Sequence, residues 1–412
     1  MKNTYRIIAL LSLLFGIFFG ACQSEKPQLK VGIWRGALIL ADQEIPFIFE
    51  VKGQSPEATT VDLINGAERF PLKNITYRND SVTIPIDLFD AVLTGKLDGN
   101  TIDGKFIKLT TAKPDPGIKF KAEFGNSNRF PQSTKTANAS LTGQWDILFA
   151  GSDKPEATVG NFEETGGSVT GSILTNTGDY RYLEGVVQGK KFQLSAFSGN
   201  SPYLVKGEFT TDSTFTGEFI TARRSTKIEG KRNPKAALAD PYSFSKLKDG
   251  YTSVEFTFPD LNGKPVSLAD PKFQGKVVIV SILGSWCPNC LDETAYLAPW
   301  YKANKDRGVE IIGLAFERKN DFDFAKRTLT RLKDRFGIEY DLLFAGLSGT
   351  ESASKALPAL SGISAFPSTI FIDKKGKVRK IHTGFSGPAT GKYYEEFKTD
   401  FNQLIDSLLT EK

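Results

Sequence analysis

The chain has 412 residues, 40% of them hydrophobic and 24% charged, a composition typical of folded proteins and not of disordered or fibrous ones. Its length predicts two or three domains. The formal net charge is only +5, without a basic block, which gives no electrostatic case for nucleic-acid binding. Three cysteines and one histidine leave few ligands for a zinc, haem or copper site.

Residues 1–21 have the pattern of a secretory signal peptide. Lys2 and Arg6 precede an apolar stretch that is shorter than the roughly 20 residues a membrane-spanning helix needs. Cys22 follows a small-residue pair, an order that resembles the lipobox of bacterial lipoproteins. That resemblance implies cleavage before Cys22 and attachment of lipid to it, with an ordinary signal peptide and an incidental cysteine as the alternative. Residues 22–31 would then form a tether, and the protein would face the periplasm from the inner or the outer membrane.

Short runs of alternating apolar and polar residues follow as far as residue 232. Residues 45–51 and 191–197 are examples, and pairs such as Asn65-Gly66 separate the runs. Alternation with period two between such turn residues predicts antiparallel strands. We therefore expect a β-rich N-terminal half made of small barrels or sandwiches. Its residues contain no recognisable catalytic constellation.

The sequence of this β-rich half also indicates an internal repeat. The triplet from Gly32 to Trp34 recurs as Gly143 to Trp145, and each copy closes with similar glycine-containing strands. We predict two related units, residues 32–130 and 140–232, followed by a linker over residues 233–250. Each tryptophan is expected to fill a barrel core and not to stack on a ligand.

The residues that indicate a chemical function are the cysteine pair Cys287 and Cys290. An apolar run over residues 277–283 predicts a buried central parallel strand, and Cys287 and Cys290 follow it as a CxxC pair that opens a predicted helix. A cysteine at a helix N-terminus faces unpaired N–H groups and the positive end of the helix dipole, which favours the thiolate. Cys287 is therefore predicted to attack, and Cys290 to resolve the mixed disulfide. Pro288 suits the first helical turn because its missing N–H is not needed there.

The cysteine pair has two other interpretations. Zinc binding is disfavoured because the other candidate ligands are only Cys22 and His382. A structural disulfide would rarely span so short a segment, although a redox-inactive descendant stays open. We expect no metal and no cofactor beyond a redox-active disulfide between Cys287 and Cys290.

Residues 251–412 resemble thioredoxin-fold reductases of the TlpA/ResA type from bacterial envelopes. Besides the CxxC pair, residues 258–268 look like the opening hairpin of that family and residues 366–373 like its proline-led strand. The resemblance implies an α/β thioredoxin-like domain in which Pro367 is a cis proline that receives an extended substrate backbone. The implied neighbours of the active site are Trp286, Pro288, Asn289 and Phe366.

The remaining elements of this domain fit the same family. After a strand over residues 309–316, the pattern predicts inserted elements, namely a helix, a strand and a helix. An edge strand and an amphipathic closing helix complete the domain. The predicted ranges are 321–336, 340–344 and 351–357 for the insertion, 377–383 for the edge strand and 393–409 for the closing helix.

Glu293 lies three residues after Cys290, where the family often has an acid near the thiols. A buried carboxyl there would raise a thiol pKa or relay its proton, and a solvated helix residue is the equally weighted alternative. Ser281 stands where thioredoxin itself has a buried aspartate, so that relay is missing. The bulk of Phe366 alters the expected substrate groove.

The leading interpretation is a lipid-anchored envelope thiol-disulfide oxidoreductase that reduces protein disulfides, the direction resting on the resemblance. The implied partners are disulfide-containing envelope proteins and a membrane electron donor, with the membrane reached through lipid on Cys22. A thiol peroxidase is one alternative, weakened because no Pro-x-x-x-Thr-x-x-Cys loop precedes Cys287. The other is a binding or scaffold lipoprotein whose redox site is incidental. Copper delivery is disfavoured by the CxxC spacing and the lack of methionine beyond the initiator.

Overall fold

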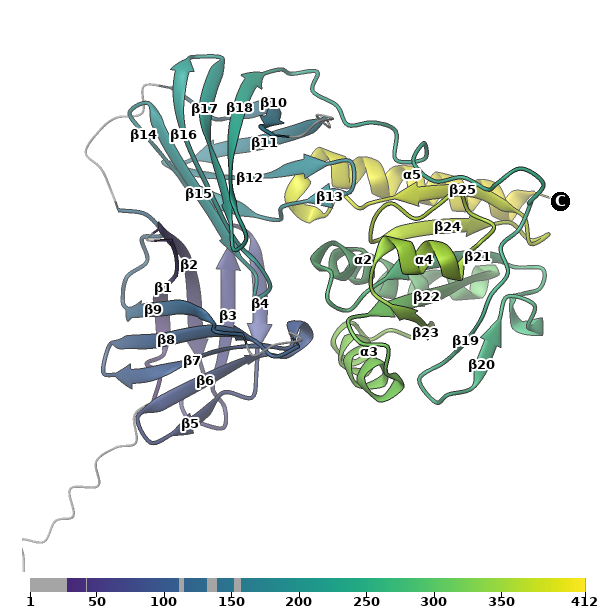
Figure 1. Ribbon diagram of the computed structural model, residues 1–412, viewed down its shortest axis with the longest axis horizontal. Coiled ribbons are helices and arrows are strands. Elements are labelled where there is room, and N and C mark those ends of the chain that lie inside the picture. The colour runs from purple at the N-terminus through teal and green to yellow at the C-terminus, as the bar shows by residue number, and fades with distance from the viewer. Residues whose placement is uncertain (1–27, 42, 111–114, 132–138, 152–156, 412) are drawn as a thin grey trace, which may run out of the picture.

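The computed structural model shows two β-rich bodies and one α/β domain (Figure 1). The predicted signal peptide, Cys22 and most of the predicted tether lie outside the described residues. Within the part of the chain that is described, no helix is both long and apolar enough to cross a membrane. The structure describes residues 28–41, 43–110, 115–131, 139–151 and 157–411.

The first β-rich body is one antiparallel sheet of nine strands. The strand order is β4-β3-β2-β1-β9-β8-β7-β6-β5, with β4 and β5 at its two ends. Successive side chains of a strand point to opposite faces, and the inward set, which includes Trp34 and Phe47, is fully buried. The strands are β1 (Gly32–Leu40), β2 (Gln43–Lys52), β3 (Thr60–Asn65), β4 (Glu68–Leu72), β5 (Thr76–Arg78), β6 (Ser81–Ile86), β7 (Ala91–Asp98), β8 (Thr101–Lys108) and β9 (Ile118–Phe124), with the 3-10 helix η1 (Asp87–Phe89) before β7.

The second β-rich body closes into a barrel. Its order is β11-β10-β18-β17-β16-β15-β14-β12-β13, and β11 also pairs with β12. The pairings therefore return to their start, and the short β13 extends from β12. Closure removes exposed strand edges. The strands are β10 (Gly143–Phe149), β11 (Thr158–Thr165), β12 (Ser168–Thr175), β13 (Gly178–Asp179), β14 (Leu183–Gln188), β15 (Lys191–Phe197), β16 (Pro202–Thr211), β17 (Thr214–Thr221) and β18 (Ser225–Arg232).

Trp34 and Trp145 occupy matching places in the two bodies. Both are fully buried, so the prediction that they fill the cores is confirmed. Each donates its indole N–H to the carbonyl oxygen four residues earlier, Lys30 at 2.9 Å and Leu141 at 2.8 Å. In both bodies the strand that carries the tryptophan pairs with the last strand.

The C-terminal domain is a five-stranded sheet covered by helices (Figure 1), in the order β23-β22-β21-β24-β25. The predicted central strand is β21, buried throughout, parallel to β22 and antiparallel to β24. The predicted hairpin, strands and helices of this domain all lie within three residues of the observed ones. The elements are β19 (Thr257–Pro259), β20 (Pro265–Ser267), η2 (Pro271–Phe273), β21 (Val277–Leu283), α2 (Pro288–Asn304), η3 (Lys305–Arg307), β22 (Val309–Glu317), α3 (Phe322–Phe336), β23 (Asp341–Leu347), α4 (Thr350–Ala356), β24 (Ser368–Ile372), β25 (Val378–Thr383), η4 (Pro388–Thr390) and α5 (Lys392–Thr410).

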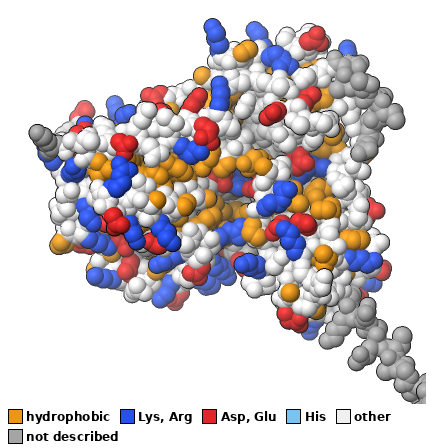
Figure 2. Space-filling model, turned by 180° about the vertical axis from the view of Figure 1, so that it is seen from behind, with side chains coloured by type: hydrophobic (Ala, Val, Ile, Leu, Met, Phe, Trp, Pro, Cys, Tyr) orange, Lys and Arg blue, Asp and Glu red, His pale blue; other side chains and the backbone are white. Residues whose placement is uncertain are grey.

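The predicted linker is a strap packed on the α/β domain. Tyr393 of α5 donates its hydroxyl to the carbonyl oxygen of Ala236 at 3.0 Å, and Leu247 forms a β-bridge with Leu360. These contacts hold the barrel close to the C-terminal domain. Figure 2 shows basic and acidic side chains intermixed on the face opposite to that of Figure 1, with apolar side chains between them.

Candidate active site

Cys287 and Cys290 lie at the start of α2. Cys287 is the N-cap residue of that helix, and its Sγ accepts a hydrogen bond from the backbone N–H of Cys290 at 3.4 Å. Both thiols are free. An N–H of the first helical turn therefore points at Cys287 Sγ, which lies at the positive end of the helix dipole, the position expected of an attacking thiol.

The two thiols have different environments. Cys290 is fully buried, whereas Cys287 keeps 6% of its surface exposed. Burial raises the pKa of Cys290 well above that of a free thiol, and its hydrogen bond with Cys287 adds to the rise. Cys290 therefore holds its proton at neutral pH, whereas Cys287 lies at the N-terminus of α2.

The segment that precedes β24 meets Cys287 from the other side. The Phe366–Pro367 peptide bond is cis, as the family resemblance implied, and the Cys287 thiol donates to the carbonyl oxygen of Phe366 at 3.5 Å. The Phe366 ring packs against Trp286 with centroids 5.5 Å apart. Trp286 is held in turn by its indole N–H, which donates to the carbonyl oxygen of Phe316 at 2.8 Å.

Glu293 is a buried carboxyl on α2. Only 1% of its surface is exposed, so the interpretation as a solvated helix residue is wrong. Its carboxylate accepts hydrogen bonds from the hydroxyls of Ser281 at 2.6 Å and Thr369 at 2.5 Å. Burial raises the pKa of Glu293 to about 7, although both hydrogen bonds act in the opposite direction. The position where thioredoxin has its aspartate thus carries a serine that binds a carboxyl from the helix.

Glu317, the last residue of β22, is a second buried carboxyl that the sequence reasoning missed. It accepts hydrogen bonds from the backbone N–H of Ser285 at 2.9 Å and from its hydroxyl at 2.7 Å, two residues before Cys287. Burial raises the pKa of Glu317 to about 7. The available signal was a glutamate directly after the uncharged run over residues 311–316 of the strand.

The barrel directly contacts residues 286–290, which we call the redox loop. Asn200, between β15 and β16, donates to the carbonyl oxygen of Trp286 at 3.3 Å. The side-chain amide of Asn289 lies against β13, where its nitrogen donates to the carbonyl oxygen of Asp179 and its oxygen accepts from the N–H of the same residue, both at 3.2 Å. These partners are far apart in the sequence, so no local pattern indicated them.

Arg181 connects all three bodies. Its guanidinium donates to the carbonyl oxygen of Pro288 at 3.1 Å, pairs with Asp292 of α2 at 2.7 Å, and pairs with Glu68 of the first body. The Arg181 side chain is 11% exposed, so its charge is largely desolvated and is compensated by two carboxylates. Burial raises the pKa of Asp292 to about 7, and Arg181 opposes that rise.

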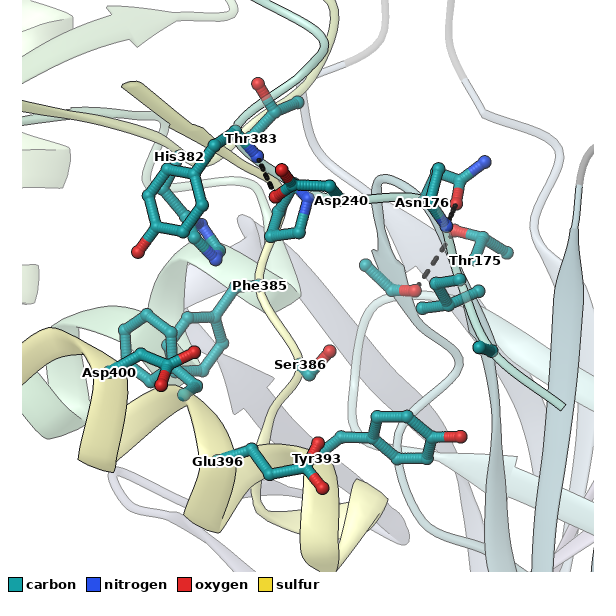
Figure 3. A pocket seen from close by; sticks show the side chains of 17 residues that line it. Thr175, Asn176, Asp240, His382, Thr383, Phe385, Ser386, Tyr393, Glu396 and Asp400 are labelled. Atoms are coloured by element: carbon teal, nitrogen blue, oxygen red, sulfur yellow. Dashed lines mark hydrogen bonds between the residues drawn. The ribbon is translucent and has the colours of Figure 1, made fainter. Parts of the chain in front are cut away.

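A cavity of about 320 Å³ lies between the barrel, the strap and α5 (Figure 3). Asp240, His382 and Tyr393 are among its lining residues, and neither cysteine is. The cavity is therefore separate from the thiol pair. Among the residues described, no group of three or more histidine, cysteine, aspartate or glutamate side chains is arranged to hold a metal ion.

Comparisons with known proteins concern the C-terminal region. Residues 248–396 match the Redoxin family model. The chain is 29% identical over 141 residues to the thiol-disulfide oxidoreductase ResA of Halalkalibacterium halodurans, covering 34% of this chain and 71% of the relative. It is 30% identical over 135 residues to ResA of Geobacillus thermodenitrificans, covering 33% of this chain and 69% of the relative. The solved structure of a putative thiol:disulfide interchange protein DsbE from Chlorobium tepidum aligns with a TM-score of 0.31 at 22% identity, over 40% of this chain and 99% of that one.

The fold and the thiol pair define the C-terminal region as a thioredoxin-like redox domain. Through this domain the chain belongs to the ResA/TlpA-like family of thiol-disulfide oxidoreductases. The family and the enzyme class predicted from the sequence are therefore confirmed. The matched region begins at residue 248, after both β-rich bodies.

Proposed function

We propose that the protein is a membrane-anchored envelope enzyme that reduces disulfide bonds of other proteins through Cys287 and Cys290. The observation that carries this proposal is the contrast between the two thiols. Cys287 Sγ lies at the N-terminus of α2 beside Phe366, and Cys290 is buried behind it with a raised pKa. This is the asymmetry that an attacking and a resolving thiol require.

The reaction has two exchange steps. The thiolate of Cys287 attacks one sulfur of the substrate disulfide, forms a mixed disulfide and releases the other substrate sulfur as a thiolate. Cys290 then loses its proton and attacks Cys287 Sγ, which closes the Cys287–Cys290 disulfide and releases the second substrate thiol. Two electrons pass to the substrate, so a membrane-bound dithiol donor must reduce the pair again. We assign to Glu293, whose charge acts on Cys290, the uptake of the Cys290 proton.

Trapping of the mixed disulfide tests this function. Cys290→Ser blocks resolution, so substrates should accumulate as disulfide-linked adducts of the full chain that disappear on reduction. The matched control is the Cys287→Ser/Cys290→Ser double variant. Equal adduct levels in both variants would contradict the exchange mechanism. Peroxide consumption by the wild type without reduction of insulin disulfides would favour the thiol peroxidase, and partner binding without either activity would favour the scaffold.

The anchoring part of the proposal rests on the sequence of the first 22 residues. A lipid on Cys22 would place the enzyme at the envelope membrane, where several acyl chains hold far more firmly than one. Incorporation of labelled palmitate tests this, with loss of label and release from membranes expected for Cys22→Ser.

We also infer that the two β-rich bodies are copies of one ancestral unit. The support is the matching burial and indole hydrogen bonds of Trp34 and Trp145. The open sheet and the closed barrel would then be two outcomes of one strand pattern. The first body has β2 paired with β3 just as the barrel has β11 paired with β12, and the two bodies differ in the pairing of β12 with β14, which has no counterpart in the first.

A further inference from the structure

The barrel covers one side of the redox loop. Asp179 binds the amide of Asn289, and Arg181 binds the carbonyl oxygen of Pro288, so both residues between the cysteines are in contact with the barrel. A Cβ atom at Gly178 would overlap the Asn289 amide, which shows how tightly the two surfaces fit. A substrate therefore has no room on the side of Pro288 and Asn289.

The other side of Cys287 is formed by aromatic and basic side chains. Trp286 and Phe366 pack together beside the sulfur, and the guanidinium of Arg318 lies over the Trp286 ring at 5.6 Å from its centroid. Arg318 is exposed and close enough to Cys287 to interact electrostatically. This side thus offers apolar surface and a positive charge to an approaching chain.

The first β-rich body contributes a further cation at this place. Lys108, at the end of β8, donates to the side-chain oxygen of Asn200 at 3.2 Å, and Asn200 is bound to the carbonyl oxygen of Trp286. Burial, reinforced by the charges of Arg318 and Arg223, lowers the pKa of Lys108 to about 8, and Asp115 opposes the shift. Lys108, Arg318 and Arg223, the last between β17 and β18 of the barrel, therefore act electrostatically on one another, and Arg318 also acts on Cys287.

Asp90 and Glu317, the carboxyls that act electrostatically on Arg318, are engaged elsewhere. Asp90 pairs with Arg331 at 2.8 Å, and Glu317 is bound to Ser285 and has a pKa raised by burial. The positive charge at the open side of Cys287 is thus only partly neutralised within the protein. An anionic chain lying there would supply the missing counter-charge.

We propose that the redox site selects acidic polypeptide substrates, which reach Cys287 along Trp286 and Phe366 with carboxylates facing Lys108, Arg223 and Arg318. This inference rests on the proposed disulfide exchange and names its substrate class. It also gives the β-rich half a role, since the barrel closes one approach and both bodies supply cations to the other.

Two disulfide-bonded peptides of equal length test the inference, one with glutamates and one with lysines flanking the cysteines. For the full wild-type chain at low salt, kcat/KM should be at least about fivefold higher for the acidic peptide, which is the scale of one solvent-exposed charge contact. The ratio should fall as salt is added because exposed charges are screened. Comparison of two substrates on one protein cancels any change in the reactivity of Cys287 itself.

The Lys108→Gln/Arg223→Gln/Arg318→Gln triple variant removes all three cations and should bring this ratio close to one. Lys105→Gln and Lys319→Gln are matched controls from the segments of Lys108 and Arg318 and should keep it. Arg318→Gln alone, at an exposed position, should lower the ratio even if the triple variant fails to fold.

Equal rates for both peptides in the wild type, or a preference that survives in the variants, would overturn the inference while leaving the exchange function intact. Reduction of neither peptide would instead contradict the proposed function.

Discussion

At the scale of single residues, the site depends on buried carboxyls that are held by hydroxyl groups and not by a direct ion pair. Glu293 is held by two hydroxyls and Glu317 by Ser285. Burial disfavours the charged form of such groups, which raises the pKa of each to about 7. A carboxyl with a pKa near 7 can accept a thiol proton and return it, which an ordinary glutamate does poorly.

Replacement of Glu293 should change how stability depends on pH. Between about pH 4.5 and 7 the folded wild type holds a proton on Glu293 that the unfolded chain has lost, so its stability falls as pH rises. With a pKa of about 7, that loss is about 3 kcal/mol. Glu293→Gln carries no such proton, so its unfolding free energy should rise relative to wild type across this window, as measured by denaturant titration at several pH values.

Glu255→Gln, at an exposed position before β19, is the control and should follow the wild type. A constant difference between Glu293→Gln and wild type from pH 4.5 to 7 would contradict the assignment. The rate of mixed-disulfide resolution gives a second readout, because its step near pH 7 should be absent in Glu293→Gln.

At the scale of elements, hydrophobic periodicity was sufficient for the redox domain. The run from Val277 to Leu283 is apolar at every position because β21 is buried on both faces, and Asp321 marks the start of α3 by accepting a hydrogen bond from the Phe324 N–H. In the β-rich half, the same alternation fits a sandwich or a barrel. The barrel closes where β12 pairs with β14 across the intervening β13, and no local pattern distinguishes these strands from the others, so closure was not predictable.

The ion cluster around Arg181 should hold the barrel on α2. Arg181→Met removes the cation from two buried carboxylates, Glu68 and Asp292, and should cost about 3 kcal/mol or more, because a buried charge without its partner is strongly destabilising. Denaturant unfolding measures the loss. Arg224→Met, at an exposed position, should cost little.

The triple variant Arg181→Met/Glu68→Gln/Asp292→Asn gives the sharper comparison. It should recover part of the loss, since neutral amides leave no unpaired charge. If the triple variant is less stable than Arg181→Met alone, the carboxylates stabilise the interface by some means other than pairing with Arg181.

At the scale of the whole molecule, the site is completed by contacts that cross the three bodies. Sequence motifs predicted Cys287, Cys290 and the cis proline, because each lies in a local pattern. The partners Asn200 and Arg181 were not predictable, since they meet the redox loop only after the barrel has closed and the strap has packed. Asn200 is an ordinary turn residue, and Arg181 adopts a φ of 60° that its residue type does not indicate.

Substitution at Gly178 tests whether the barrel covers the thiols. Gly178 has φ +150°, and a Cβ atom there would overlap the Asn289 amide, so Gly178→Ala should push β13 away from the redox loop. Reaction of Cys287 with a bulky maleimide should then accelerate more than its reaction with iodoacetamide, raising the ratio of the two rates severalfold. Gly189→Ala is the matched control, because Gly189 has φ +62° with nothing near its Cβ position; it adds backbone strain without touching the loop. An unchanged ratio in Gly178→Ala would mean that the bulky reagent reaches Cys287 entirely from the side of Trp286 and Phe366, and that the barrel limits neither the rate nor the size of what enters.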